Sequence, residues 1–260
     1  MNLTFDHAVI VVPELDAAVR QFSAAGFTVV PGGRHDVIPT VNALIALADG
    51  GYLELLAPRD ADARESLGVR ASRRGWSAEV RRAPAIARRF LPSLVGPPGV
   101  ADWAMRTDDL ARVARSLRRV GIKATGPVPM RRARADGVEL EWKMLLPDDP
   151  SFPFFVEDVT PRSLRVPEDP GSRTHGNGAS GVASVRVSVE AIAAAALAYA
   201  DVFGATPRAV PNGTTALDLA GARVVLEHGA PVGARGVGVR CPGAMPEGVA
   251  ALGVGGESAA

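Results

Sequence analysis

The chain carries one recurring order of hydrophobic and polar segments. Residues 3–12 alternate and then become continuously apolar, which is typical of a strand that is half buried at one end and fully buried at the other. Residues 13–26 space their apolar side chains along one helical face, with Gly26 available to end the helix in a left-handed conformation. After a turn-rich segment, two apolar runs are joined by Asp49-Gly50-Gly51, a strong hairpin signal. This pattern predicts a βαβββ unit.

The same order returns 95 residues later without a gap. A repeat of this kind decides the fold, because each copy is one structural unit. We therefore predict two paired βαβββ modules, at residues 1–58 and 99–161, within a domain that spans residues 1–165. The matched positions are His7 with Asp102, Leu15 with Leu110, Phe22 with Leu117, and Gly26 with Gly121.

Three apolar strands each contain one glutamate, followed four residues later by proline. These glutamates are Glu54, Glu157 and Glu227. An unpaired carboxylate inside a buried strand costs several kcal/mol, so a balancing charge is expected beside each one. The spacing matches Glu157 to Glu54 in the two modules.

A third copy of the unit is weaker. Residues 182–260 supply a strand, a helix and a closing strand, but Ser184 stands where the first module has His7, and Glu227 is interpreted as structural. Residues 166–181 have the composition of a linker, and the arginine-rich residues 59–98 are expected to form a helical insertion. The fold class predicted is α+β, with tandem βαβββ modules forming a curved mixed sheet around a cleft and a degenerate third module packed on the outside.

The stretches "DHAVIVVPELDAAVRQFSAAGF", "YLELLAP", "ADWAMRTDDL" and "FFVEDVTP" resemble the vicinal oxygen chelate superfamily, and within it the glyoxalase-like domain proteins. In that fold, metal ligands come from the first and last strands of each module. The resemblance implies His7, Glu54, Asp102 and Glu157 as the metal ligands. Histidine is the usual residue at the position of Asp102.

The resemblance also implies chemistry. A divalent metal (Mn, Mg, Fe, Zn, Ni or Co) would polarise neighbouring oxygens of a small substrate as a Lewis acid, and three carboxylates favour a hard metal. Glu157 or Glu54 would then act as the catalytic base in an isomerase, epimerase or lyase reaction. Ring-cleaving dioxygenase chemistry is less favoured, because only one of the four matched residues is a histidine.

Two alternatives follow from the same residues. The carboxylates could instead form ion pairs, with Arg106 as a partner for Asp102 if the strand alternates regularly. The chain would then be a metal-free protein that binds a small molecule of the antibiotic or polyketide kind. Whether the protein is an enzyme is thus left open between these readings.

Composition limits the remaining classes of partner. The net charge of +1 gives no case for nucleic acid, and the longest apolar run is shorter than the roughly 20 residues that cross a bilayer. The first residues lack a basic leader, and Cys241 is the single cysteine, so we expect a cytoplasmic protein without a membrane partner. A small-molecule ligand or substrate is the expected partner, and a homodimer is considered as the assembly.

Overall fold

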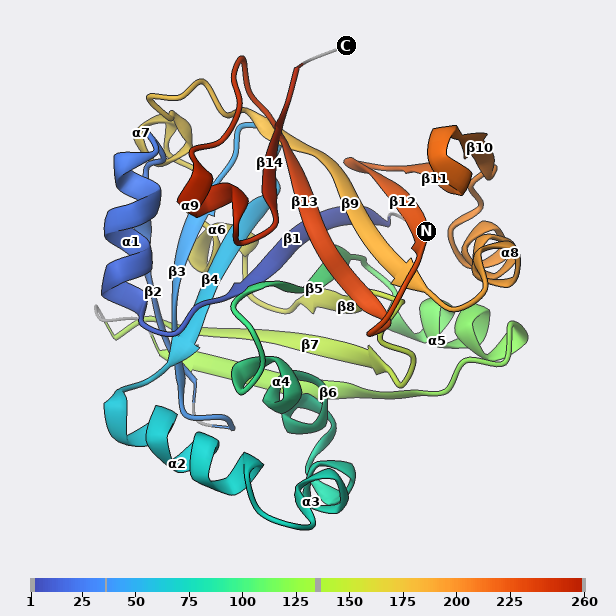
Figure 1. The fold of residues 1–260 in the computed structure, drawn as a ribbon, viewed down its shortest axis with the longest axis horizontal. Coiled ribbons are helices and arrows are strands. Elements are labelled where there is room, and N and C mark those ends of the chain that lie inside the picture. Colours follow the sequence, from blue (N-terminus) through green and yellow to red (C-terminus); the bar gives the residue numbers. More distant parts are fainter. Residues whose placement is uncertain (1–2, 36, 134–136, 259–260) are drawn as a thin grey trace.

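The computed structural model describes residues 3–35, 37–133 and 137–258 (Figure 1). Within these residues the chain forms an eight-stranded and a six-stranded mixed sheet with helices packed on them. The predicted α+β class with tandem βαβββ modules is confirmed. The outermost residues of the first and last predicted units, 1–2 and 259–260, lie outside the described residues.

The first module begins at the amino-terminal end of the described chain. Its helix begins where the Glu14 side chain accepts hydrogen bonds from the backbone N–H groups of Asp16 and Ala17, at 3.1 and 2.8 Å. It ends before Gly26, whose φ of 85° is the left-handed conformation that glycine adopts without strain. The elements are β1 (Thr4–Val11), α1 (Leu15–Ala24), β2 (Val30–His35), β3 (Thr40–Ala46) and β4 (Tyr52–Pro58).

The second module repeats these features. Asp109 accepts a hydrogen bond from the Arg112 backbone at 2.8 Å where the helix begins, and Gly121 follows its end with a φ of 79°. Gly26 and Gly121 therefore end equivalent helices, as predicted from the repeat. The elements are β5 (Gly99–Arg106), α5 (Leu110–Arg119), β6 (Ala124–Ala133), β7 (Glu139–Pro147) and β8 (Phe154–Asp158).

The two modules share one sheet with the strand order β2-β3-β4-β1-β5-β8-β7-β6. Antiparallel β1 and β5 lie at its centre, each flanked by a parallel strand of its own module. The sheet curls until β2 contacts β6. A Cβ at Gly33 would lie 2.7 Å from the Arg132 Cδ, so a larger residue at this position would require the Arg132 side chain to shift. The concave face thus becomes the interior of a cleft.

Three helices of the segment 59–98 lie at one end of this cleft: α2 (Ala61–Ala71), α3 (Trp76–Arg82) and α4 (Ala85–Leu94). Helix α4 packs against β7 and buries Phe90, Leu91 and Leu94. Figure 1 shows α2 and α3 farther from the sheet than α4. The insertion therefore reaches the concave face through α4.

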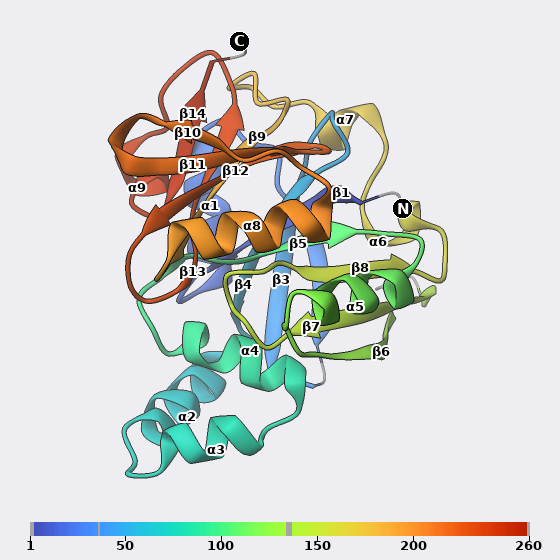
Figure 2. The ribbon, with the colours of Figure 1, turned by 90° about the vertical axis from the view of Figure 1, so that its right-hand side faces the viewer.

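The third unit forms the second sheet, with the order β10-β11-β12-β9-β13-β14. Figure 2 shows α8 lying between this sheet and α5. Alternate residues of β1, such as Ala8 and Ile10, pack toward this unit, whereas Val9 and Val11 face the cleft side. Among the described helices none is long and apolar enough to span a bilayer. The remaining elements are α6 (Arg162–Arg165), α7 (Pro170–Arg173), β9 (Gly181–Val189), α8 (Ile192–Phe203), β10 (Arg208–Val210), η1 (Pro211–Gly213), β11 (Thr214–Leu219), β12 (Ala222–His228), β13 (Gly233–Arg240), α9 (Glu247–Ala250) and β14 (Val254–Glu257).

Candidate functional site

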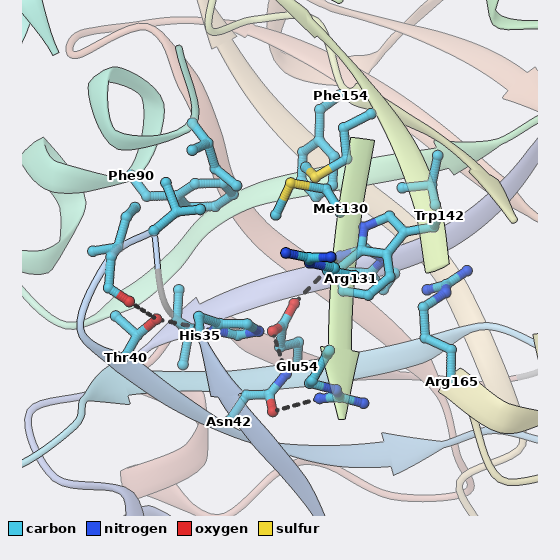
Figure 3. Close-up of a pocket in the computed structure, with 18 of the residues that line it drawn as sticks. His35, Thr40, Asn42, Glu54, Phe90, Met130, Arg131, Trp142, Phe154 and Arg165 are labelled. Atoms are coloured by element: carbon cyan, nitrogen blue, oxygen red, sulfur yellow. Dashed lines mark hydrogen bonds and ion pairs between the residues drawn. The ribbon is translucent and has the colours of Figure 1, made fainter. Parts of the chain in front are cut away.

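A cavity of about 360 Å³ lies between the concave face of the first sheet and α4. Its volume is in the range of small-molecule sites. Figure 3 shows Phe90, Met130 and Phe154 along one side of this cavity, Thr40, His35, Asn42 and Glu54 along the other, and Arg131 beside Trp142. The polar groups include His7, His35, Thr40, Asn42 and Glu54, and the apolar groups include Ile86, Phe90, Met130, Trp142, Met144 and Phe154.

Glu54 is the carboxylate that reaches the cavity from β4. The amide Nδ2 of Asn42 donates to Glu54 Oε1 at 2.6 Å, and His7 Nε2 lies 3.4 Å from Oε2. Burial alone would raise the pKa of Glu54, but His7, His35 and the Asn42 amide outweigh it and lower the pKa to about 2. Glu54 is therefore ionised at any physiological pH.

His7 connects Glu54 to a second, deeper carboxylate. Its Nδ1 lies 2.8 Å from Asp6 Oδ2, and its ring stacks on Tyr52 with centroids 4.5 Å apart. Burial would lower the pKa of His7, but the hydrogen bonds to Asp6 and Glu54 raise it above its ordinary value. The contact with Asp6 fixes which ring nitrogen faces Glu54.

Asp6 is fully buried behind this histidine, at an irregularity in the pairing of β1 with β5. Arg165 Nη1 donates to it at 2.9 Å, and Arg162 Nη2 donates at 3.2 Å. Burial would raise the pKa of Asp6, but Arg165, His7 and Arg162 hold it well below its usual range. Glu54, His7, Asp6 and Arg165 thus form one chain of charged groups that runs from the cavity into the protein.

Asp102 has a different environment from His7, its counterpart in the repeat. Arg89 of α4 donates to both of its carboxylate oxygens, at 2.5 and 2.8 Å, and both side chains are 7% exposed. Arg89 also donates to the backbone carbonyls of Pro147 and Phe152. The basic partner of Asp102 is Arg89 and not Arg106, which the strand pattern had indicated. Asp102 is not among the residues that line the cavity.

Glu157 lies on the face of β8 opposite to the cavity. Phe154 and Val156 face the cleft, while Phe155 packs into the core on the other side, and Glu157 follows this alternation. Its carboxylate accepts from Lys143 Nζ at 3.0 Å and from the Leu110 backbone at 3.1 Å, at the start of α5. These contacts are those of an ion pair and a helix cap.

The structure therefore brings together only two members of the predicted metal-ligand set, His7 and Glu54. Among the described residues, no group of three or more His, Cys, Asp or Glu side chains is placed to hold a metal ion. Asp102 is engaged by Arg89, and Glu157 projects from the other face of its strand. This donor arrangement does not fit the four-ligand metal centre implied by the resemblance.

Several residues of the site were missed from the sequence. Asp6 precedes His7 directly, and Asn42 is a polar residue within an apolar strand, so both carried a local signal. Arg165 carried no local signal in the sequence, because it reaches Asp6 only when α6 lies beside β1. Glu227 and Ser184 belong to the second sheet, where Ser184 Oγ donates to Glu257 at 2.5 Å.

Comparisons with known proteins place this geometry in context. A family model described as a glyoxalase-like domain matches residues 5–203. A comparison with curated proteins finds no match. Among solved structures, a hypothetical protein from Staphylococcus aureus is similar with a TM-score of 0.74 and 18% identity, covering 99% of this chain and 100% of that one.

Two further structures share less. A xylose isomerase-like TIM barrel/4-hydroxyphenylpyruvate dioxygenase fusion protein has a TM-score of 0.50 and 14% identity, covering 92% of this chain and 36% of that one. A methylmalonyl-CoA epimerase of Streptomyces coelicolor has a TM-score of 0.38 and 22% identity, covering 61% of this chain and all of that one. At 18% and 14% identity, the similarity to the first two of these structures concerns the fold alone.

Proposed function

This chain belongs to the family of glyoxalase-like domain proteins, and from that premise we propose that it is an enzyme that transfers a proton at a carbon next to a carbonyl group of a small substrate. Glu54 and His7 would be the acid-base pair. The observation that supports this is the charged chain from Glu54 through His7 and Asp6 to Arg165, because such a costly buried arrangement opens into a ligand-sized cavity.

The two groups would work as one unit. An imidazole and a carboxylate 3.4 Å apart share their protons, so the pair takes up its first proton near the raised pKa of His7 and its second only near pH 2. Glu54 would receive the proton from the substrate carbon and share it with His7 Nε2. The base strength of the pair is then that of His7, whose pKa is raised above its ordinary value by Asp6 and Glu54.

Tyr52 would stabilise the oxygen on which negative charge develops. Its hydroxyl accepts from Arg165 Nη1 at 2.8 Å and so keeps its own proton for donation. Burial first, and then the nearby Asp6 and Glu54, raise the pKa of Tyr52 well above its ordinary value, so this donor stays protonated. Returning the proton to another carbon would give isomerisation, and returning it to the other face of the same carbon would give epimerisation. If the enolate instead expels a leaving group from the neighbouring carbon, and that group takes the proton, the result is elimination.

The proposal does not use a metal ion, because Asp102 and Glu157 are directed to other partners. A test is solvent exchange. Wild-type protein is incubated in D₂O with a panel of small ketones, 2-hydroxyketones and 2-oxoacids, and mass spectrometry measures deuterium at the carbon next to the carbonyl. We expect incorporation with wild type, at least about 100-fold slower incorporation with Glu54→Gln, and wild-type rates with Glu157→Gln as the control.

Among the described residues, the second module contributes no carboxylate or histidine to the lining of the cavity. This observation favours a second function. A protein that only binds and sequesters its ligand would have no need of them. Compounds that bind in the cavity but exchange no proton in any member of the panel would support this alternative and contradict the proposed enzyme.

A further inference from the structure

Two groups of residues that line the cavity differ in chemistry; the lining also includes Arg131, Arg132 and Arg165 and the apolar Val37, Ile38, Leu44 and Leu56. We define the polar wall as His7, His35, Thr40, Asn42 and Glu54, all from the first module, and the apolar wall as Phe90, Met130, Trp142, Met144 and Phe154, from α4 and the second module. Figure 3 shows the labelled members of these walls on opposite sides of the cavity. A ligand between these two walls would meet apolar side chains over one face and polar side chains along another edge.

The apolar wall is built to contact a broad surface. Met130 and Trp142 are direct neighbours across the β6–β7 ladder, and Phe90 meets Phe154 edge to face with centroids 5.8 Å apart. Aromatic rings and polarisable thioethers bind the face of another ring favourably. Trp142 is only partly buried without a ligand, so its ring is accessible.

The polar wall presents hydrogen-bond acceptors to a ligand. Glu54 uses one oxygen for Asn42 and the other for His7, and a carboxylate has about four acceptor positions in all. A hydroxyl group of the ligand can therefore donate to Glu54 without displacing either contact. An ether or a hydrocarbon at the same place would offer no hydrogen-bond donor to Glu54.

Ion pairs fix the elements that border the cavity. Helix α4 is tied to the sheet at one end by Arg89 and Asp102, and Arg165 lines the cavity at the other end with ion pairs to Asp6 and Asp158. A flexible chain confined here would lose rotational freedom at each bond, whereas a ring has lost it already.

We propose that the substrate is a planar ring compound with oxygen substituents along one edge, a hydroxylated aromatic or an enolisable cyclic ketone, whose face lies on Trp142 and Met130 and whose oxygenated edge meets Glu54. This assignment rests on the proposed function only in calling the bound compound a substrate. The binding geometry itself requires no turnover.

The test uses 2-naphthol as the ring probe and 1-decanol, with the same number of non-hydrogen atoms, as the flexible probe. Protein labelled with ¹³C at the methionine methyl groups is titrated with each and followed by NMR. We expect ring-current shifts at Met130 and Met144 with 2-naphthol, and none at Met105, which is buried on the opposite side of the sheet. Dissociation constants should be about tenfold lower for 2-naphthol than for 1-decanol.

Variants separate the contributions of the two walls. Trp142→Leu should weaken 2-naphthol binding about tenfold, whereas Trp76→Leu, on α3 beyond the cavity lining, should leave it unchanged. Wild type should bind 2-naphthol more tightly than 2-methoxynaphthalene, which lacks the hydroxyl donor. The ratio of the two dissociation constants should be closer to one in Glu54→Gln. If Trp142→Leu does not fold, the methionine shifts of the wild type still decide.

Equal or tighter binding of 1-decanol, or 2-naphthol shifts confined to methionines outside the cavity, would overturn the ring assignment. A negative deuterium-exchange panel combined with positive 2-naphthol binding would instead overturn the proposed enzyme and leave the ligand class standing. The two failures are therefore distinguishable.

Discussion

Glu54 and Phe154 occupy equivalent positions in the two modules. Glu54 of β4 is paired with Val9 of β1, and Phe154 of β8 is paired with Ala104 of β5, which lies 95 residues after Val9 in the repeat. Both side chains enter the same cavity. The position that carries an ionised carboxylate in the first module is thus an aromatic ring in the second.

This relationship explains the one-sided chemistry of the cleft. The motif spacing matched Glu54 to Glu157, but the strand pairing matches it to a residue three positions earlier. An odd displacement along a strand moves a side chain to the other face. Glu157 therefore caps α5, and Phe154 contributes to the apolar wall.

If Glu54 and His7 are the proposed acid-base pair, the rate of deuterium exchange should rise with pH. The pKa of His7 is raised above 6.5 by its contacts with Asp6 and Glu54, and the pair accepts a substrate proton only when His7 is neutral. We expect the second-order rate constant of deuterium exchange to increase through that raised pKa and then level off. A rate that rises to a plateau below pH 5 would contradict the role of His7.

Glu54→Gln should destabilise the fold most at mildly acidic pH. Folding raises the pKa of His7 from 6.5, so its contribution is complete below that pH and is lost as pH rises through the folded value. Folding lowers the pKa of Glu54 from 4.5 to about 2, so its contribution is complete above pH 4.5 and is lost as pH falls toward 2. Urea unfolding should show a loss of about 1–3 kcal/mol between these limits and less on either side. A loss independent of pH would refute the pairing.

Arg89→Met should cost about 3–5 kcal/mol, because it leaves the charge of Asp102 buried without a partner. The double variant Arg89→Met with Asp102→Leu should recover most of that loss. Arg88→Ala is the matched control, since Arg88 pairs with Asp148 at the surface and contributes less than about 1 kcal/mol. A double-mutant cycle by chemical denaturation measures the coupling, and strictly additive losses would show that the two residues do not interact.

Glu157→Gln should leave deuterium exchange unchanged, because this carboxylate lies on the face of β8 away from the cavity. A modest loss of stability of about 1 kcal/mol is expected from the weakened cap of α5 and the lost pair with Lys143. Thermal unfolding and the exchange assay on the same sample separate the two effects. A loss of activity without a loss of stability would return Glu157 to the catalytic centre.

Metal addition and chelation should leave the melting temperature unchanged. A ligand that binds only the folded state raises the apparent stability, and the donors here are directed to Arg89, Lys143 and each other. Differential scanning fluorimetry with Mn(II), Zn(II) or a chelator measures this. A stoichiometric metal that disappears in His7→Ala would show that the donors rearrange to form a centre.

The periodicity of the chain by itself determined the modules. Apolar spacing, the Asp49-Gly50-Gly51 turn and the two helix-ending glycines are local signals, so the βαβββ order and the place of His7 on the first strand and Glu54 on the last strand of the first module followed from the sequence. These features depend on neighbours within a few residues, and the structure has them where the pattern indicated.

The tertiary structure alone decided which charges meet. Whether Glu157 or Phe154 occupies the position equivalent to Glu54 depends on how β8 aligns with β5. The spacing of residues within each strand does not reveal how distant strands pair. Arg89 and Arg165 reach Asp102 and Asp6 from helices 13 and 159 residues away in the chain. Packing of those helices on the sheet supplied the counter-charges that the buried carboxylates required, because electrostatic balance is set by proximity in space and not by order along the chain.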